Sequence, residues 1–167
     1  WRSDDAGATW TRKIPNRDSA HTSGVAVSPA DPNTVLYTTL EGDVHRTSDG
    51  GESWAPVLGR NASYPDGGVG GTQFTAVAFS SENQSVAYTT ATSEARSPVK
   101  KQSDPSDFYA TNDAGLTWRL AGICDDCGAI HSIVVEPEDS ESVWISGVGG
   151  VQKSTDGGQT WSGNLLV

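Results

Sequence analysis

TSDGGESW, residues 47–54, is one of four copies of a single octapeptide pattern in this 167-residue chain. The other copies are SDDAGATW (3–10), TNDAGLTW (111–118) and STDGGQTW (154–161). Each copy reads Ser or Thr, any residue, Asp, any residue, Gly, any residue, Thr or Ser, Trp. We number them in chain order as the first to the fourth octapeptide. Such a repeat indicates one supersecondary unit that the chain builds several times.

The segments between the octapeptides repeat as well. GVAVSPADPNTVLYTT (24–39), AVAFSSENQSVAYTT (76–90) and SIVVEPEDSESVWIS (132–146) each contain a short apolar run, a polar turn and a second apolar run. Their β-branched and aromatic residues and their regular turn spacing are typical of strands. We therefore predict four strands per unit. The first strands are 25–27, 77–79 and 133–135, the second 35–38, 86–89 and 143–146, the third 43–47, 107–111 and 150–154, and the fourth begin at the octapeptide Trp.

The octapeptide is predicted to be the hairpin between the third and fourth strands. Its Asp accepts hydrogen bonds from turn amides, its Gly supplies a positive φ, and its Trp packs on a neighbouring hairpin. A calcium loop needs several carboxylates at alternate positions, so we expect neither a metal site nor catalysis here. The residues given this structural role are Asp5, Gly7, Trp10, Asp49, Gly51, Trp54, Asp113, Gly115, Trp118, Asp156, Gly158 and Trp161.

On these motifs the chain resembles the Asp-box (BNR) repeat β-propeller family. In texture it is similar to the repeats of xyloglucan-degrading hydrolases, sortilin-type receptors and photosystem-assembly propellers. The resemblance covers nearly the whole chain and implies an all-β fold of four-stranded antiparallel blades. An Asp box forms the hairpin between the third and fourth strands of a blade. We predict one domain (1–167), with a half-blade at 1–20 and blades at about 21–58, 72–121 and 129–165. These three and a half blades are expected to be part of a larger ring, completed by further sequence or by another chain.

The composition limits the partners. Eleven basic and twenty-one acidic residues give a formal net charge of −10. This balance argues against nucleic acid and anionic membranes as partners, because both attract a basic face. No apolar run reaches the ~20 residues that cross a bilayer. The chain has no Met and opens on Trp1, so we expect a processed piece of a longer protein. We also expect an extracellular or periplasmic location and no cofactor.

The spacing of the box aspartates points to two insertions. Successive box aspartates lie 44, 64 and 43 residues apart, and the extra length falls in segments 59–73 and 93–107. The resemblance places both segments on the face opposite the boxes, where the family has its substrate sites. The candidate ligand-binding residues in them are Tyr64, Asp66, Arg96, Lys100 and Lys101. The competing interpretation is a pair of tolerated surface insertions.

CDDC, residues 124–127, is a third irregular connection on the same face. Cys124 and Cys127 form a local disulfide, remain free thiols or act as a redox pair; we favour the disulfide, because no helix or second metal-binding pair is indicated nearby. The flanking Asp125 and Asp126 are candidate ligand-binding residues.

Three further residues are candidates for binding. His21 and His131 precede or open the innermost strands, so they are candidates for the central channel of a propeller, although a lone histidine more often has a surface or hydrogen-bonding role. Trp144 alternates away from its neighbours and is a candidate for stacking on a sugar, with packing between blades as the alternative.

No catalytic residues are assigned from the sequence. A glycosidase needs two carboxylates roughly 5 to 10 Å apart across a cleft, and no loop carboxylate is distinguished by its neighbours. We predict a non-catalytic propeller segment that acts as a protein- or glycan-binding or assembly scaffold. Its partners are then a protein, a polysaccharide or the remaining blades. The alternative is part of a secreted glycoside hydrolase, xyloglucanase-like or, less favoured, sialidase-like.

Overall fold

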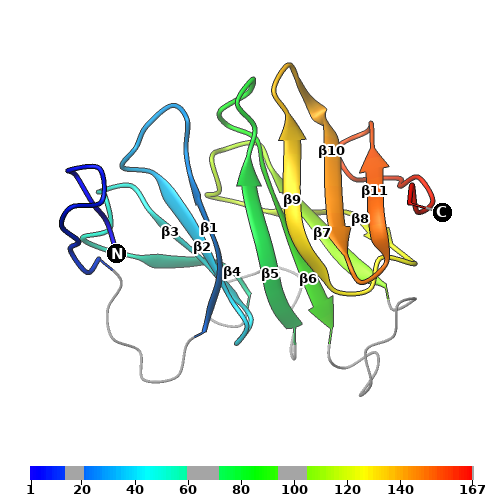
Figure 1. Cartoon of the computed structure of the whole chain (residues 1–167), viewed down its shortest axis with the longest axis horizontal. Helices are drawn as coiled ribbons and strands as arrows, with labels where there is room; N and C mark the ends of the chain where they lie inside the picture. The colour runs from blue at the N-terminus through cyan, green and yellow to red at the C-terminus, as the bar shows by residue number, and fades with distance from the viewer. Residues whose placement is uncertain (14–20, 60–71, 94–104, 167) are drawn as a thin grey trace.

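The computed structural model describes residues 1–13, 21–59, 72–93 and 105–166. Within these ranges the chain forms three antiparallel sheets and no helix (Figure 1). The first sheet contains β1 (Thr22–Val27), β2 (Val35–Thr39), β3 (Asp43–Thr47) and β4 (Ala55–Gly59). The second contains β5 (Thr72–Phe79), β6 (Ala87–Ser93), β7 (Ser106–Thr111) and β8 (Arg119–Cys124), and the third contains β9 (Ile130–Glu136), β10 (Asp139–Gly147) and β11 (Gly150–Ser154).

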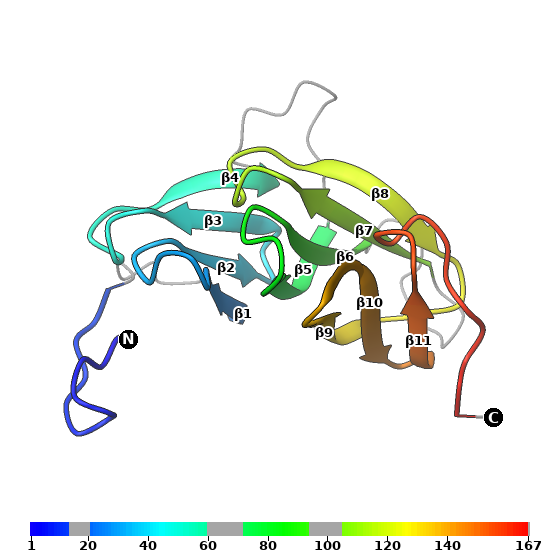
Figure 2. The ribbon, with the colours of Figure 1, turned by 90° about the horizontal axis from the view of Figure 1, so that it is seen from above.

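The sheets stand side by side as blades. Strands pair in sequence order within each sheet, and the first strands β1, β5 and β9 contact one another between sheets. Figure 2 shows the sheets along an arc, with β1, β5 and β9 on its inner side and β4 and β8 on its outer side. This arrangement confirms the prediction of an all-β fold with four-stranded antiparallel units.

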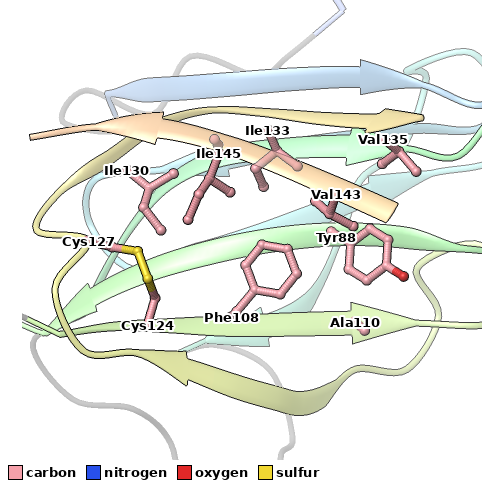
Figure 3. Close-up of a cluster of buried hydrophobic side chains, with 11 residues drawn as sticks. Tyr88, Phe108, Ala110, Cys124, Cys127, Ile130, Ile133, Val135, Val143 and Ile145 are labelled. Atoms are coloured by element: carbon pink, nitrogen blue, oxygen red, sulfur yellow. A yellow bond between two sulfur atoms is a disulfide. The ribbon is translucent and has the colours of Figure 1, made fainter. Parts of the chain in front are cut away.

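Two hydrophobic clusters hold the sheets together. One lies between the first and second sheets and includes Leu36, Val44 and Phe74, all fully buried. The other lies between the second and third sheets around Phe108 (Figure 3). Apolar residues at alternate positions of neighbouring strands therefore form inter-sheet cores, as expected for sheets that are buried on both faces.

The opening half-blade forms less structure than the sequence predicts. The strand pairing in its described residues, 1–13, is one bridge, in which Arg2 and Thr11 exchange backbone hydrogen bonds of 2.8 Å each. An isolated pair of short strands buries too little surface to extend the ladder.

The fourth strand predicted after Trp161 is also absent as a regular strand, because residues 161–166 form none. The tail nevertheless follows the pairing of a fourth strand: Ser162 N donates to Lys153 O at 2.8 Å and Leu165 N to Val151 O at 2.9 Å. The Asn164 side chain accepts from Val151 N at 3.3 Å. Glycine and asparagine, both unfavourable in strands, interrupt the apolar alternation here.

None of the described residues belongs to a helix with the length and apolarity that crossing a bilayer requires.

Candidate functional site

The four Asp boxes share one hydrogen-bond pattern. In the second box the Thr47 hydroxyl donates to Asp49 Oδ1 at 2.6 Å and accepts from Gly51 N at 3.0 Å. Ser53 donates to the same carboxylate from its amide at 3.0 Å and from its hydroxyl at 2.5 Å. The equivalent bonds recur in the boxes of Asp5, Asp113 and Asp156. The carboxylates therefore fix the turn.

Backbone geometry explains the glycine at the fifth position. The φ angles there are +92° at Gly7, +92° at Gly51, +84° at Gly115 and +87° at Gly158. Side chains of other residues resist this left-handed region.

The third and fourth boxes also contact the preceding sheet. A β-carbon at Gly115 would lie 2.7 Å from Leu36 Cδ2 of β2, and one at Gly158 would overlap the Phe108 ring of β7. Arg46 Nε of β3 donates to the carbonyl of Ala114 at 2.9 Å. Each of these boxes therefore closes its own hairpin and packs its glycine against the sheet before it.

The hydrogen bonds of the boxes predict a loss of stability in acid. Bonds from Thr9 and Thr160 lower the pKa of Asp5 and of Asp156 to about 2. Because the folded pKa lies below the unfolded value of about 3.9, the bonds stabilise the protein above pH ~4 and are lost as the pH falls towards ~2. We expect the urea midpoint to drop across that window. In a Thr160→Val variant the drop should be smaller, since the largest contribution to the shift of Asp156 is removed; an unchanged midpoint between pH 4 and 2 would contradict this assignment.

A polar groove lies beside β11 and the tail that pairs with it. It has a volume of about 870 Å³ and lies between the end of β8, the Cys124–Cys127 loop and residues 159–164. Its lining comprises Ile123, Cys124, Asp125, Asp126, Gly149, Gln152, Gln159, Thr160, Trp161, Ser162, Gly163 and Asn164. Carboxylates, amides and hydroxyls thus share one surface with part of a tryptophan.

A disulfide and close backbone packing position the loop of this groove. Cys124 and Cys127 are joined and both are buried. Gly149 N donates to Cys127 O at 2.8 Å, and the Ser106 hydroxyl donates to Gly128 O at 2.5 Å. Asp125 and Asp126 between the two cysteines remain exposed. The loop therefore presents two acceptor side chains from a constrained backbone.

The fold brings the irregular connections to one end of the second sheet. Thr72 pairs with Ser93, Thr92 pairs with Ser106, and Ser106 pairs with Cys124. The start of β5, the end of β6, the start of β7 and the end of β8 therefore lie at the same end of the second sheet. The predicted residues Tyr64, Asp66, Arg96, Lys100 and Lys101 lie outside the described residues.

The other candidates do not converge on the groove. His21 is exposed, and its Nδ1 lies 2.7 Å from Glu41 Oε1. His131 is exposed on β9. Trp144 donates its indole N–H to Glu136 Oε1 at 2.8 Å, and the Lys153 ammonium lies 5.0 Å from the centre of its ring. Of the predicted ligand-binding residues within the described ranges, Asp125 and Asp126 line the groove.

Sequence reasoning missed the other polar residues of the groove, among them Gln159 and Asn164. For Asn164 the available signal was the stretch WSGNLL (161–166). It breaks the apolar pattern that follows the second and third boxes in WAPVLG (54–59) and WRLAGI (118–123). Across the described ranges, no group of three or more His, Cys, Asp and Glu residues is placed to hold a metal ion.

Comparisons with known proteins agree with this geometry. The BNR/Asp-box repeat model matches residues 152–162. A xyloglucanase of Hypocrea jecorina (strain QM6a) is 27% identical over 159 residues, which is 95% of this chain and 16% of that protein. The chain thus spans about one sixth of the length of this curated relative.

Solved structures show the same fold. An ancestral GH74 enzyme superposes with a TM-score of 0.64 at 21% identity, covering 85% of this chain and 18% of the other. YCF48 from Cyanidioschyzon merolae superposes with a TM-score of 0.61 at 20% identity, covering 90% and 39%. One of the four octapeptides thus matches the BNR/Asp-box repeat model, and the solved structures show that the chain has the fold of β-propeller blades.

Proposed function

We propose that this chain is a non-catalytic Asp-box propeller segment that binds an oligosaccharide in the groove beside β11. The lining of the groove carries this proposal. Asp125 and Asp126 supply acceptors. Gln159 supplies the acceptor Oε1, while its Nε2 donates to Asp156 O at 2.8 Å. Asn164 supplies the donor Nδ2, while its Oδ1 accepts from Val151 N and Leu166 N. Sugar hydroxyls need both kinds of partner, and an indole face such as that of Trp161 suits their apolar C–H faces.

The class of ligand follows from the similarity to a xyloglucanase, so a xyloglucan oligosaccharide is the first to test. The Cys124–Cys127 disulfide supports an extracellular or periplasmic location, because disulfides persist in oxidising compartments.

A second candidate function is half of a glycoside hydrolase cleft. Two observations favour it: the 27% identity to a xyloglucanase and the adjacent exposed carboxylates of Asp125 and Asp126 in the groove. A hydrolase would release new reducing ends from xyloglucan, whereas a binding segment releases none. The two candidates are therefore separated by one assay on the same polypeptide.

Calorimetric titration with a xyloglucan oligosaccharide tests binding. We expect the double variant Asp125→Asn, Asp126→Asn to weaken affinity about tenfold or more, because hydrogen bonds to charged acceptors are lost. Glu138→Gln is the matched control, since Glu138 is an exposed carboxylate in the turn between β9 and β10, outside the groove. Absence of binding by the unaltered chain, or equal affinities of the double variant and the unaltered chain, would contradict the proposal.

A further inference from the structure

The outer face of the third sheet, which points away from the second sheet, presents apolar side chains. Val134 is 57% exposed, and Trp144 and Val151 are half-buried. Lys153 lies over the ring of Trp144 and is bonded to Glu136 at 2.7 Å. We call Val134, Trp144, Val151 and Lys153 the box-receiving face.

Strand register shows which residues are equivalent in the three sheets. The residue that opens a box pairs with Val35, Ala87 or Val143 of the second strand. One position further along, the cross-strand pairs are Leu36 with Arg46, Tyr88 with Ala110, and Trp144 with Lys153. Trp144 therefore occupies the position of Leu36 and Tyr88, and Lys153 occupies that of Arg46.

In the first and second sheets, this position contacts the Asp box of the next sheet. Leu36 packs against Gly115 of the third box, and Arg46 donates to the Ala114 carbonyl at 2.9 Å. A β-carbon at Gly157 of the fourth box would lie 3.3 Å from Tyr88 Oη, and Tyr88 also stacks on Phe108, whose ring meets Trp161 of that box edge-on. The same face of each of these two sheets thus accepts a box, while no box among the described residues packs against the third sheet.

The first box, residues 3–10, is the complementary surface. A β-carbon at Gly7 would meet only Trp10 of the same box, at 3.8 Å, and Trp10 is 57% exposed, compared with 6% for Trp118. Its backbone already has the form that a sheet accepts, since φ is 55° at Ala6 and 57° at Ala114. Both views show this hairpin and β11 at opposite ends of the molecule (Figures 1 and 2). One copy therefore cannot satisfy both surfaces itself.

We propose that the first Asp box of one copy packs against the box-receiving face of a second copy, head to tail. Trp144 then lies against Gly7 as Leu36 lies against Gly115, and Lys153 donates to the Ala6 carbonyl as Arg46 does to that of Ala114. Such a heterologous contact builds closed rings or open chains, depending on the rotation between copies. The contact is separate from the groove and does not depend on oligosaccharide binding.

Sedimentation of the full chain over a concentration series tests this contact. The unaltered chain should associate reversibly. Trp10→Ser should remove the box surface and Lys153→Glu the receiving face, each raising the dissociation constant about tenfold or more. Arg119→Glu is the matched charge reversal on exposed Arg119 of β8, away from both surfaces, and should associate like the unaltered chain. Circular dichroism of each variant verifies the fold.

Sedimentation of a mixture of the two variants distinguishes a head-to-tail contact from other association. Trp10→Ser keeps an intact receiving face and Lys153→Glu keeps an intact box, so an equimolar mixture should form a 1:1 dimer that stops growing. A monomeric unaltered chain at every concentration would overturn the proposal. It would also be overturned if the variants associate like the unaltered chain, or if the mixture behaves as the sum of two monomers.

Discussion

Replacing Phe108 by alanine is expected to lower the free energy of unfolding by about 3–5 kcal/mol. Phe108 is fully buried in β7, where it stacks on Tyr88 with 5.3 Å between centroids (Figure 3). Its ring also meets Trp161 edge-on. Truncation leaves a cavity at the junction of the second sheet, the third sheet and the fourth box. Urea unfolding followed by tryptophan fluorescence measures the loss.

Leu120→Ala provides the control for this prediction. Leu120 lies in the neighbouring strand β8 and is 50% exposed, so its truncation should change stability by less than about 1 kcal/mol. If the two variants unfold at similar urea concentrations, Phe108 does not hold the sheets together in the way described here.

Gly158→Ala is expected to destabilise the chain by about 3 kcal/mol, through two separable effects. The backbone at Gly158 is left-handed, with φ of +87°, and an added β-carbon would overlap the Phe108 ring. Gly7→Ala isolates the first effect, because Gly7 has φ of +92° and the added carbon would meet only Trp10, at an ordinary contact distance of 3.8 Å. Its expected cost is about 1–2 kcal/mol.

The difference between these two glycine variants, measured as the difference in unfolding free energy, therefore reports the packing of a box against a sheet. Equal losses would mean that the box glycine serves its own turn alone. A larger loss at Gly158 supports the role of the fourth box between the second and third sheets.

Much of the fold follows from local sequence. The octapeptide specifies its own turn, because the Asp, the Gly and the two hydroxyl residues bond to one another within eight residues. The period-two pattern then predicts the strands on either side. These signals are local, so they survive in a single sequence and predict part of every strand from β1 to β11, although β1, β5, β6, β9 and β10 extend three to five residues beyond the predicted bounds.

The candidate site was less predictable, because it depends on what the local pattern lacks. After Trp161 the chain keeps the pairing of a fourth strand but not its regular form, and the groove lies where this irregular tail passes β8. Asp125 and Asp126 were predicted from the CDDC loop, whereas Asn164 depends on the tail and Gln159 lies within the fourth octapeptide. Similarly, only the register of Trp144 with Lys153 shows that this tryptophan lies on a face that accepts an Asp box in the other sheets.

We propose that the box aspartates fix their turns and that a ligand binds in the groove beside β11, which Gln159, Thr160 and Trp161 of the fourth box help to line. A two-dimensional amide NMR titration of the isotope-labelled chain with a xyloglucan oligosaccharide tests it most directly. The account predicts chemical-shift changes at Asp125, Asp126 and residues 162–164, with the second and third boxes (47–54 and 111–118) unchanged. Shifts centred on Asp49 and Asp113, or no shifts at any concentration, would contradict it.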